Sequence, residues 1–330
     1  MEQRRFGTTD LRASAVGFGT WPIGNTGNYG RSDDDLAVRA IHAALDLGIT
    51  CFDTAANYGG GHSEVLLGRG LGKRRQDVVL LTKGGIVYDD TGRTLRRDSG
   101  RAYLEWCING SLERLGTDYL DLFLIHWPDT ATPMAEMVGV MEDFVRQGKT
   151  RYIGVSNFNA AQLRECAAAA QAAPIAAEQV GYNLFDRRWE REVFGVCQDL
   201  GVSVMAYGPL AHGLLADAYN AETTFEEGDW RRKGNVFGQP LFTPENFPRN
   251  LAVVARLKEY AHAHGWTLPQ LALAWVLVNP AVSVALVGAR TEAEIAAAIG
   301  AAERELTADD RRELDAIMAD AAGMTEAVPA

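Results

Sequence analysis

The sequence has few cysteines and no long apolar run. Its 330 residues include four cysteines, Cys51, Cys107, Cys166 and Cys197, and no two of them form a Cys-x-x-Cys pair. We therefore expect reduced thiols in a cytosolic protein and no disulfide framework. No apolar segment approaches membrane-spanning length, and the first ten residues, MEQRRFGTTD, lack the apolar core of a signal peptide. The prediction is a soluble, cytoplasmic protein without a membrane partner.

Positive charge is scarce as well. The chain has 32 Lys and Arg residues against 43 Asp and Glu residues, which gives a formal net charge of -11. Because a nucleic-acid-binding protein generally presents a basic face, we expect no nucleic-acid partner. A local basic pocket for a phosphate group is still compatible with this charge.

Two motifs that would point to other architectures or sites are missing. No Gly-x-Gly-x-x-Gly turn follows an early apolar segment, which disfavours an open, doubly wound nucleotide-binding sheet. No cluster of His, Cys, Asp or Glu has convincing metal-ligand spacing, so we expect no metal site.

Eight short apolar segments alternate with longer helical patterns along the chain. Most of these segments are almost continuously apolar, as expected for parallel strands that are buried on both faces. The alternation predicts a (β/α)8 barrel, also called a TIM barrel, that forms a single domain over residues 1–330. The predicted strands cover residues 15–21, 49–54, 78–83, 119–127, 150–157, 176–183, 202–208 and 282–289.

Three further features are expected outside this alternation. Residues 4–14 contain a turn signal between two short extended stretches, which predicts an N-terminal β-hairpin that closes the bottom of the barrel. Residues 307–321 predict an extra C-terminal amphipathic helix. The segment from about 208 to 250 is long, polar and rich in Gly and Pro, and its scattered aromatic residues favour an ordered functional loop over disorder. For the first helix of the alternation, Ser32 is the predicted cap and Gly48 the predicted stop.

Polar residues follow the predicted strands at the end where a barrel carries its chemistry. Asp53, Lys83 and His126 end three successive strands, and Tyr58 lies just beyond Asp53. A lysine cation lowers the pKa of a nearby phenol, and a carboxylate keeps a buried lysine charged. Histidine can hydrogen-bond an oxygen on which negative charge develops. This set suits protonation of a carbonyl oxygen, and the hydride must come from a cofactor because no member is a reductant.

Each of these residues also has a purely structural interpretation. Asp53 and Lys83 are compatible with a structural buried ion pair, and His126 alone is compatible with a core histidine. Ser156 and Asn157 can cap the helix that begins near residue 160. The joint placement of the acid, the phenol, the amine and the imidazole favours catalysis.

Six segments resemble the aldo-keto reductase superfamily, in the order and at the spacing of that family. The resemblance extends from GFGTW at residues 17–21 to LVGAR at residues 286–290, which is nearly the whole chain. It implies reversible reduction of aldehydes or ketones to alcohols, with Asp53, Tyr58, Lys83 and His126 as the catalytic tetrad and Tyr58 as the general acid. The segments are FDTAANYGGGHSEVLLG, LLTK, DLFLIHWPD, YIGVSNF, EQVGYNL and MAYGPLAHGLL.

The resemblance also implies a nicotinamide cofactor. Ser156, Asn157 and Gln179 would hold the carboxamide of the nicotinamide, and Tyr207 would stack on its ring. Arg290 would meet the adenosine 2′-phosphate, which favours NADP (NADPH), although NAD is possible because Glu294 would repel that phosphate. An Asn that often contacts adenine in the family is replaced here by alanines at residues 296–298. Further cofactor contacts would come from the loop that wraps the pyrophosphate and from the last strand, at Gly208, Pro209, Leu210 and Gly288.

The expected partner is a small-molecule carbonyl substrate, and the sequence defines no oligomeric state. Tyr58, His126, Trp21 and Trp127 are predicted to contact this substrate, and polar groups in the segment 84–98 would suit a sugar-like compound. Other aromatic and apolar residues expected around the pocket are Ile23, Tyr29 and Tyr88. Two alternatives stand beside the enzyme: a cofactor-binding regulatory subunit of the channel-associated type with little turnover, and a cofactor-independent hydrolase or isomerase.

Overall fold

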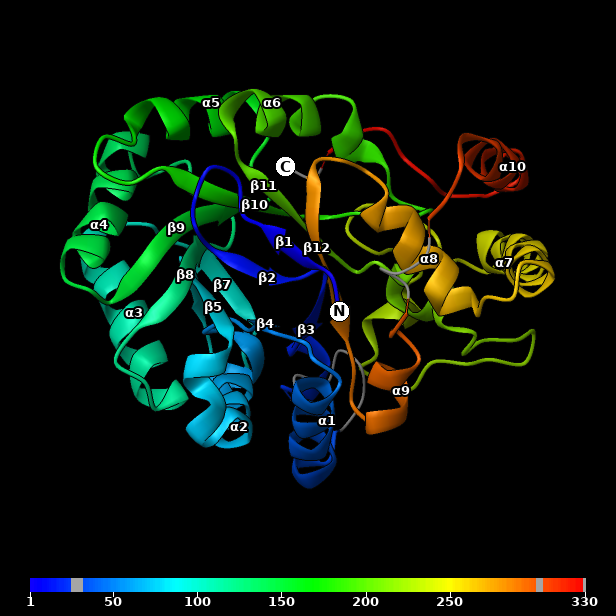
Figure 1. Ribbon diagram of the computed structural model, residues 1–330, viewed down its shortest axis with the longest axis horizontal. Coiled ribbons are helices and arrows are strands. Elements are labelled where there is room, and N and C mark those ends of the chain that lie inside the picture. The colour runs from blue at the N-terminus through cyan, green and yellow to red at the C-terminus, as the bar shows by residue number, and fades with distance from the viewer. Residues whose placement is uncertain (25–31, 301–304, 329–330) are drawn as a thin grey trace.

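The computed structural model describes residues 1–24, 32–300 and 305–328, which contain a closed barrel of eight parallel strands (Figure 1). Each strand coincides with a predicted segment, so the (β/α)8 prediction is confirmed. Their residues are buried almost throughout, which explains the continuous apolar pattern. The strands, in order around the barrel, are β3 (Val16–Gly19), β4 (Cys51–Asp53), β5 (Val79–Gly84), β8 (Leu120–Ile125), β9 (Thr150–Ser156), β10 (Ile175–Gly181), β11 (Ser203–Tyr207) and β12 (Val282–Gly288).

Helices cover the outside of the barrel. Two of them, α7 (Asn246–Ala263) and α10 (Ala308–Met318), are additions to the alternating pattern, and they lie together outside α8 (Figure 1). The C-terminal helix predicted at 307–321 is therefore confirmed as α10. The other helices are α1 (Asp34–Asp46), α2 (His62–Leu71), α3 (Arg101–Leu115), α4 (Met134–Arg146), α5 (Ala160–Ala169), α6 (Val193–Leu200), α8 (Leu268–Leu277) and α9 (Glu292–Ala296).

The start of α1 differs by one residue from the predicted start. Its cap is Asp33, whose carboxylate accepts a hydrogen bond of 2.9 Å from the backbone N–H of Leu36. The Ser32 hydroxyl instead donates to the carbonyl of Ile23 at 3.1 Å. The chain leaves the helix through Gly48 at φ 84°, a conformation that glycine adopts without steric cost, as the predicted stop requires.

A two-stranded antiparallel hairpin, β1 (Gln3–Arg5) and β2 (Arg12–Ser14), closes the bottom of the barrel as predicted. Phe6 and Leu11 of its turn are fully buried among side chains of the barrel interior. The hydroxyl of Ser283, near the start of β12, donates to the carbonyl of Arg5 at 3.1 Å. The hairpin therefore seals the end opposite the carboxyl ends of the strands.

Two insertions rise at the carboxyl ends of the strands. The segment 84–98 forms an unpredicted antiparallel hairpin of β6 (Ile86–Tyr88) and β7 (Thr94–Arg97). The segment 208–250 contains 3-10 turns at Ala211–Ala216 and Trp230–Lys233 before α7 begins. Side chains from both insertions line the groove described below.

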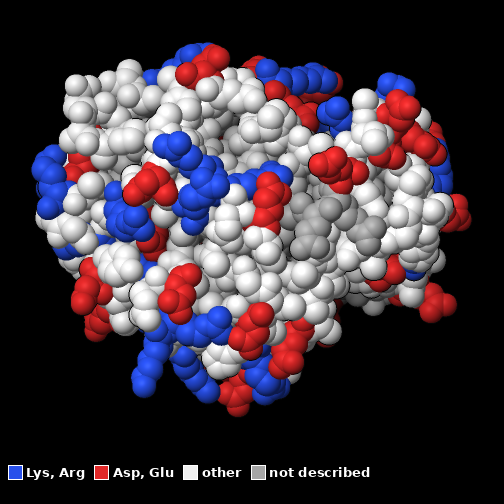
Figure 2. Space-filling view, in the orientation of Figure 1, with Lys and Arg blue, Asp and Glu red and all other residues white. Residues whose placement is uncertain are grey.

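The surface and the thiols agree with the composition. On the face shown in Figure 2, acidic and basic side chains are interspersed, as on an ordinary solvated surface. All four cysteines are buried and unpaired, which confirms the prediction of free thiols. Among the described residues, no helix has both the length and the apolar character needed to cross a membrane.

Candidate active site

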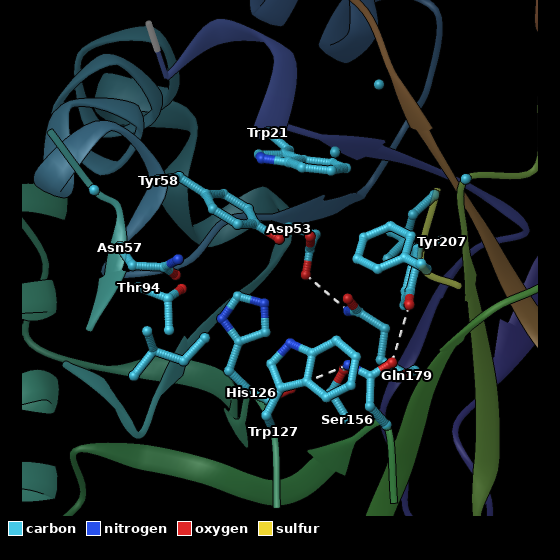
Figure 3. Close-up of a pocket in the computed structure, with 18 of the residues that line it drawn as sticks. Trp21, Asp53, Asn57, Tyr58, Thr94, His126, Trp127, Ser156, Gln179 and Tyr207 are labelled. Atoms are coloured by element: carbon cyan, nitrogen blue, oxygen red, sulfur yellow. Dashed lines mark hydrogen bonds between the residues drawn. The ribbon is translucent and has the colours of Figure 1, made fainter. Parts of the chain in front are cut away.

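A cavity of about 390 Å³ opens at the carboxyl ends of the barrel strands (Figure 3). It brings together most of the predicted site residues, although they come from seven different strands or the loops that follow them. Polar groups line its inner end, and aromatic rings line its mouth. The lining includes Asp53, Tyr58, His126, Ser156, Asn157, Gln179, Trp21, Trp127, Tyr207 and Phe237.

Lys83 does not line the cavity itself but lies buried behind its polar end, in contact with Asp53 and Tyr58. Its Nζ donates to Oδ2 of Asp53 at 2.8 Å and to the carbonyl of Thr54 at 2.9 Å. It also lies 3.3 Å from the hydroxyl of Tyr58. The lysine side chain is fully buried, with an exposed fraction of 0 %. The ammonium group therefore connects the predicted acid and the predicted proton donor within one hydrogen-bonded unit.

Burial and charge act in opposite directions on this pair. Burial lowers the pKa of Lys83, and the neighbouring Asp53 carboxylate counteracts that effect. Burial likewise raises the pKa of Asp53, while the ammonium of Lys83 lowers it. Each charge is thus stabilised chiefly by its partner, as expected where desolvation is costly.

The pKa of Tyr58 differs in direction from the sequence-based expectation. Burial is the largest cause and the charge of Asp53 is the second, and together they raise this pKa well above its ordinary value. The expectation of a lowered pKa considered only the lysine and not the desolvation of the phenolate. Tyr58 therefore keeps its proton near neutral pH, as a proton donor must.

His126 follows β8, and its backbone N–H donates to the carbonyl of Gly84 at 2.9 Å. Burial, and then the charge of Lys83, lower the pKa of His126 well below its ordinary value. The imidazole is thus neutral, and its ring meets the ring of Tyr58 edge-on at a centroid distance of 5.6 Å. Its Nδ1 has no hydrogen-bond partner within the described parts of the chain.

A chain of amide and hydroxyl contacts runs along the neighbouring strands (Figure 3). Ser156 donates from its hydroxyl to the carbonyl of Gln179 at 2.7 Å, and the Gln179 amide donates to Oδ1 of Asp53 at 2.8 Å. Tyr207 donates to the side-chain oxygen of Asn157 at 3.0 Å, and Asn157 donates to the carbonyl of His126 at 3.1 Å. These contacts fix the orientation of the amides and of the Tyr207 ring.

Asn157 has a strained backbone, with φ 64°, which is uncommon for a residue other than glycine. The alternative role of Ser156 and Asn157 as caps of α5 is wrong. Asn159 forms that cap through a capping box with Gln162. The conformation of Asn157 is therefore held by the contacts of its amide within the site.

A second cavity, also of about 390 Å³, continues the groove toward α9. It shares Pro22, Gly208, His212 and Gly288 with the first cavity. The remaining predicted cofactor residues lie along this part of the groove: Pro209, Leu210, Arg290 and Glu294.

Arg290 and Glu294 contact each other in this outer cavity. The Glu294 carboxylate accepts a hydrogen bond of 2.7 Å from the backbone N–H of Arg290, and it lies 3.5 Å from the guanidinium. Their side chains are 44 % and 43 % exposed, respectively. The only predicted phosphate-binding cation therefore shares its charge with a carboxylate.

The groove as a whole fits a dinucleotide. It is elongated, it has hydroxyl and amide groups around an aromatic ring at its inner end, and it has a guanidinium at its outer end. By contrast, the described residues include no group of three or more His, Cys, Asp or Glu side chains that could hold a metal ion.

The predicted set of aromatic and apolar side chains around the substrate is only partly present. Trp21 and Trp127 line the cavity as expected. The prediction for Ile23 is wrong because its side chain is fully buried in the hydrophobic core. The prediction for Tyr88 is wrong because Tyr88 is not among the residues that line the cavity, and its ring packs near Trp106. Tyr29 lies outside the described residues.

Several lining residues were not predicted: Asn57, Thr94, His212 and Phe237. Asn57 directly precedes Tyr58, and its proximity to a catalytic candidate was the available signal. Thr94 comes from the unpredicted hairpin. For Phe237, the only signal was an aromatic residue in a polar segment, which does not specify the direction of its side chain.

Comparison with known proteins supports the same class. The model of the Aldo/keto reductase family matches residues 15–319. The chain belongs to this family. It is 36% identical over 322 residues to the aldo-keto reductase YhdN of Bacillus subtilis, an alignment that covers 96% of this chain and 94% of that protein.

Two other similar proteins carry more specific names. The aldo-keto reductase yakc [NADP(+)] of Schizosaccharomyces pombe is 35% identical over 270 residues, covering 80% of this chain and 76% of that protein. The glycerol dehydrogenase AKR11B4 from Gluconobacter oxydans has a solved structure with a TM-score of 0.85 and 34% identity, covering 97% of this chain and 96% of that one. Family membership confirms the predicted class of carbonyl-reducing oxidoreductase, and nothing in these similarities supports a regulatory subunit.

Proposed function

We propose that this aldo-keto reductase reduces small aldehydes or ketones with NADPH, and that Tyr58 is the proton donor. The observation that carries the proposal is the position of Lys83. Its ammonium contacts both the Asp53 carboxylate and the Tyr58 hydroxyl at the inner end of the groove. A buried ion pair alone would not need a phenol in contact with the lysine and open to a cavity.

The residues around the tetrad have complementary tasks in this proposal. A bound nicotinamide supplies the hydride. Ser156, Asn157 and Gln179 hold its carboxamide through their hydroxyl and amide groups, and Tyr207 offers a ring face whose orientation is fixed by Asn157. These contacts would restrict the cofactor to one orientation, which lowers the barrier by positioning.

Tyr58 and His126 act on the carbonyl oxygen of the substrate. The neutral imidazole of His126 donates a hydrogen bond to this oxygen, and the Tyr58 hydroxyl transfers its proton as negative charge develops there. The Lys83 ammonium stabilises the resulting phenolate, because it lies within 3.3 Å of the phenol oxygen. Asp53 keeps the lysine charged during this transfer.

Cofactor and substrate preferences follow from the two ends of the groove. Arg290 supports NADPH over NADH, and the name of the yeast relative supports the same choice for this chain. Trp21, Trp127 and Phe237 leave a small cavity beside Tyr58, so we propose a small carbonyl compound, in agreement with the name of the glycerol dehydrogenase. Free buried thiols and the negative net charge support a cytoplasmic, single-domain enzyme whose partners are small molecules.

The test is Tyr58→Phe, with Tyr119→Phe as the matched control. Tyr119 precedes β8 at the other end of the barrel and packs against Arg75. Removing a general acid typically costs about 10²–10⁴-fold in rate, so kcat should fall by at least a hundredfold in Tyr58→Phe and stay unchanged in the control. The dissociation constant for NADPH, measured by fluorescence quenching, should change by less than about twofold. Turnover near the wild-type rate in Tyr58→Phe would remove Tyr58 from the mechanism.

A panel of aldehydes, ketones and sugars, assayed with NADPH and with NADH, tests the proposed substrate class and cofactor preference. Rapid oxidation of NADPH by several small carbonyl compounds is expected. NADPH binding without turnover of any of them would instead favour a regulatory, cofactor-binding role.

A further inference from the structure

Phe237 lies at the tip of a tight turn at residues 235–239. The backbone groups of Val236 and Gln239 exchange hydrogen bonds of 2.8 and 2.9 Å, and the Asn235 side chain accepts from the N–H of Gly238 at 2.9 Å. Phe237 has φ 47°, in the left-handed region that disfavours residues with a side chain. A conformation of this kind persists only where surrounding contacts hold it.

The ring of Phe237 lies near aromatic rings from both the proposed cofactor side and the proposed substrate side of the pocket. Its centroid lies 5.6 Å from that of Tyr207, the proposed nicotinamide platform, in a T-shaped arrangement. It lies 6.0 Å from Trp21 and 6.4 Å from Trp127, the two aromatic walls beside Tyr58. Phe237 is therefore placed where it limits the space beside the reacting carbonyl.

The position of this turn depends on a buried ion pair from another part of the chain. Arg188 makes two parallel hydrogen bonds to Asp186, at 2.8 and 2.7 Å, and its side chain is only 2 % exposed. The remaining nitrogen, Nη1, donates to the backbone carbonyl of Phe237 at 2.9 Å. A guanidinium fixed by a bidentate carboxylate thus holds the backbone of the strained residue.

The same guanidinium also holds the C-terminal segment. Nη1 of Arg188 donates to the carbonyl of Ala327 at 3.2 Å. A second buried side chain, Asn250, repeats this connection: its amide donates to the carbonyls of Leu241 and Ala322 at 3.0 and 3.1 Å. The C-terminal segment is therefore connected to the pocket turn through Arg188 and to Leu241, just after the turn, through Asn250.

We propose that Phe237 is a specificity-determining residue that excludes bulky carbonyl compounds, and that the Asp186–Arg188 pair is a positioning device acting through it. The inference rests on the proposed function for the identity of the substrate end. If Arg188 only stabilised the fold, its guanidinium would have no need to bind the backbone carbonyl of Phe237, the residue of the turn whose ring lines the pocket. Asp186 and Arg188 belong neither to the tetrad nor to the proposed cofactor contacts, although their charges act on Tyr207. The backbone of Asp186 also exchanges hydrogen bonds with Asn183, whose amide donates to the carbonyl of Gly208. The double variant described below distinguishes an effect through the turn from an effect through these contacts.

The experiment compares 2-naphthaldehyde with propanal, by the ratio of their kcat/KM values with NADPH. Phe237→Ala should raise this ratio at least tenfold, mainly through a lower KM for 2-naphthaldehyde. Arg188→Lys keeps the charge beside Asp186 but loses the planar, bidentate geometry, and it should raise the ratio in the same direction by a smaller factor. The matched control is Phe247→Ala, which removes an aromatic ring that lines neither cavity and should leave the ratio unchanged.

The double variant Phe237→Ala/Arg188→Lys separates positioning from a structural role. If Arg188 acts through Phe237, the double variant should have the same ratio as Phe237→Ala alone. The positioning role would be overturned if Arg188→Lys lowered kcat/KM equally for both aldehydes and if this loss added to the effect of Phe237→Ala in the double variant. An unchanged ratio in Phe237→Ala would overturn the specificity role.

A second readout does not depend on turnover. Trp21 and Trp230 lie next to Phe237, so quenching of tryptophan fluorescence by acrylamide should increase in Phe237→Ala and in Arg188→Lys but not in Phe247→Ala. If the wild-type protein reduces neither these aldehydes nor any member of the carbonyl panel, the proposed function fails. Quenching then still decides whether Arg188 positions Phe237, because unchanged quenching in Arg188→Lys contradicts that role.

Discussion

The two ends of the groove hold their charges in different ways. At the inner end, Lys83 is fully buried, comes from a barrel strand and contacts Asp53 at less than 3 Å. At the outer end, Arg290 and Glu294 are about half exposed, lie on or beside the short helix α9, and are 3.5 Å apart. Burial strengthens an electrostatic contact and makes its loss costly, whereas solvent screens an exposed contact. The inner end is therefore suited to a catalytic step that depends on a fixed geometry. The outer end is suited to adjusting the affinity for the cofactor.

The largest effect is expected for Lys83→Met. It leaves the Asp53 carboxylate buried without its cation, which typically costs about 3–5 kcal/mol of stability. It also removes the charge that stabilises the Tyr58 phenolate, so the pKa of Tyr58 rises further and kcat falls by about 10²–10⁴-fold. Urea denaturation and steady-state kinetics measure the two effects, and Lys73→Met, which removes an exposed lysine, is the control.

The pH dependence gives the decisive comparison for the same variant. In the proposed mechanism, reduction requires the protonated phenol, so the rate falls as pH rises through the pKa of Tyr58. Because Lys83→Met raises this pKa, the alkaline limb of the pH–rate profile should move to higher pH. A profile that stays in place would show that Lys83 and Tyr58 are not coupled. Adding Asp53→Asn to Lys83→Met should recover stability without recovering kcat.

The sequence was informative where a residue follows directly from the regular fold. Asp53, Lys83 and His126 are placed by the ends of strands, and the strands have an unambiguous apolar pattern. Once the barrel was predicted, the convergence of these residues followed from geometry. The direction of the Tyr58 pKa did not follow, because desolvation depends on how completely the folded chain encloses the phenol.

The pocket wall could not be predicted in this way. The direction of the Phe237 side chain is set by Arg188, which lies 49 positions away in the sequence, and Arg188 in turn contacts a residue 139 positions away. No local periodicity encodes contacts of that kind. The same holds for Thr94, since the register of its hairpin in a polar segment has no apolar pattern to define it.

At the outer end, Arg290→Ala should have a smaller effect than any change at Lys83. A hydrogen bond to a charged group is typically worth about 1.5–3 kcal/mol, which is roughly tenfold to a hundredfold in affinity. Because Arg290 is partly exposed and shared with Glu294, we expect about tenfold weaker binding of NADPH and little change for NADH. Dissociation constants from fluorescence quenching provide the measurement. Equal losses for both cofactors would mean that Arg290 does not contact the 2′-phosphate.

The smallest effect, and the sharpest comparison within the outer end, is expected for Glu294→Gln. The substitution removes a negative charge 3.5 Å from the Arg290 guanidinium, and the glutamine oxygen can still accept the hydrogen bond from the Arg290 backbone. An exposed ion pair is worth about 0.2–1 kcal/mol, so NADPH should bind about twofold to fivefold more tightly and NADH should be nearly unaffected.

Glu292→Gln is the matched control for this charge, because Glu292 lies in the same helix but pairs with Arg39 at 3.5 Å instead. If the whole negative field of α9 opposed the phosphate, both variants would tighten NADPH to a similar degree. If Glu294 acts by competing for Arg290, only Glu294→Gln has the effect, and Arg290→Ala abolishes it in the double variant. The gain should also shrink as ionic strength rises, since solvent ions screen an exposed pair. A gain that persists at high salt would place the interaction in a more enclosed site and would remove the distinction between the two ends of the groove.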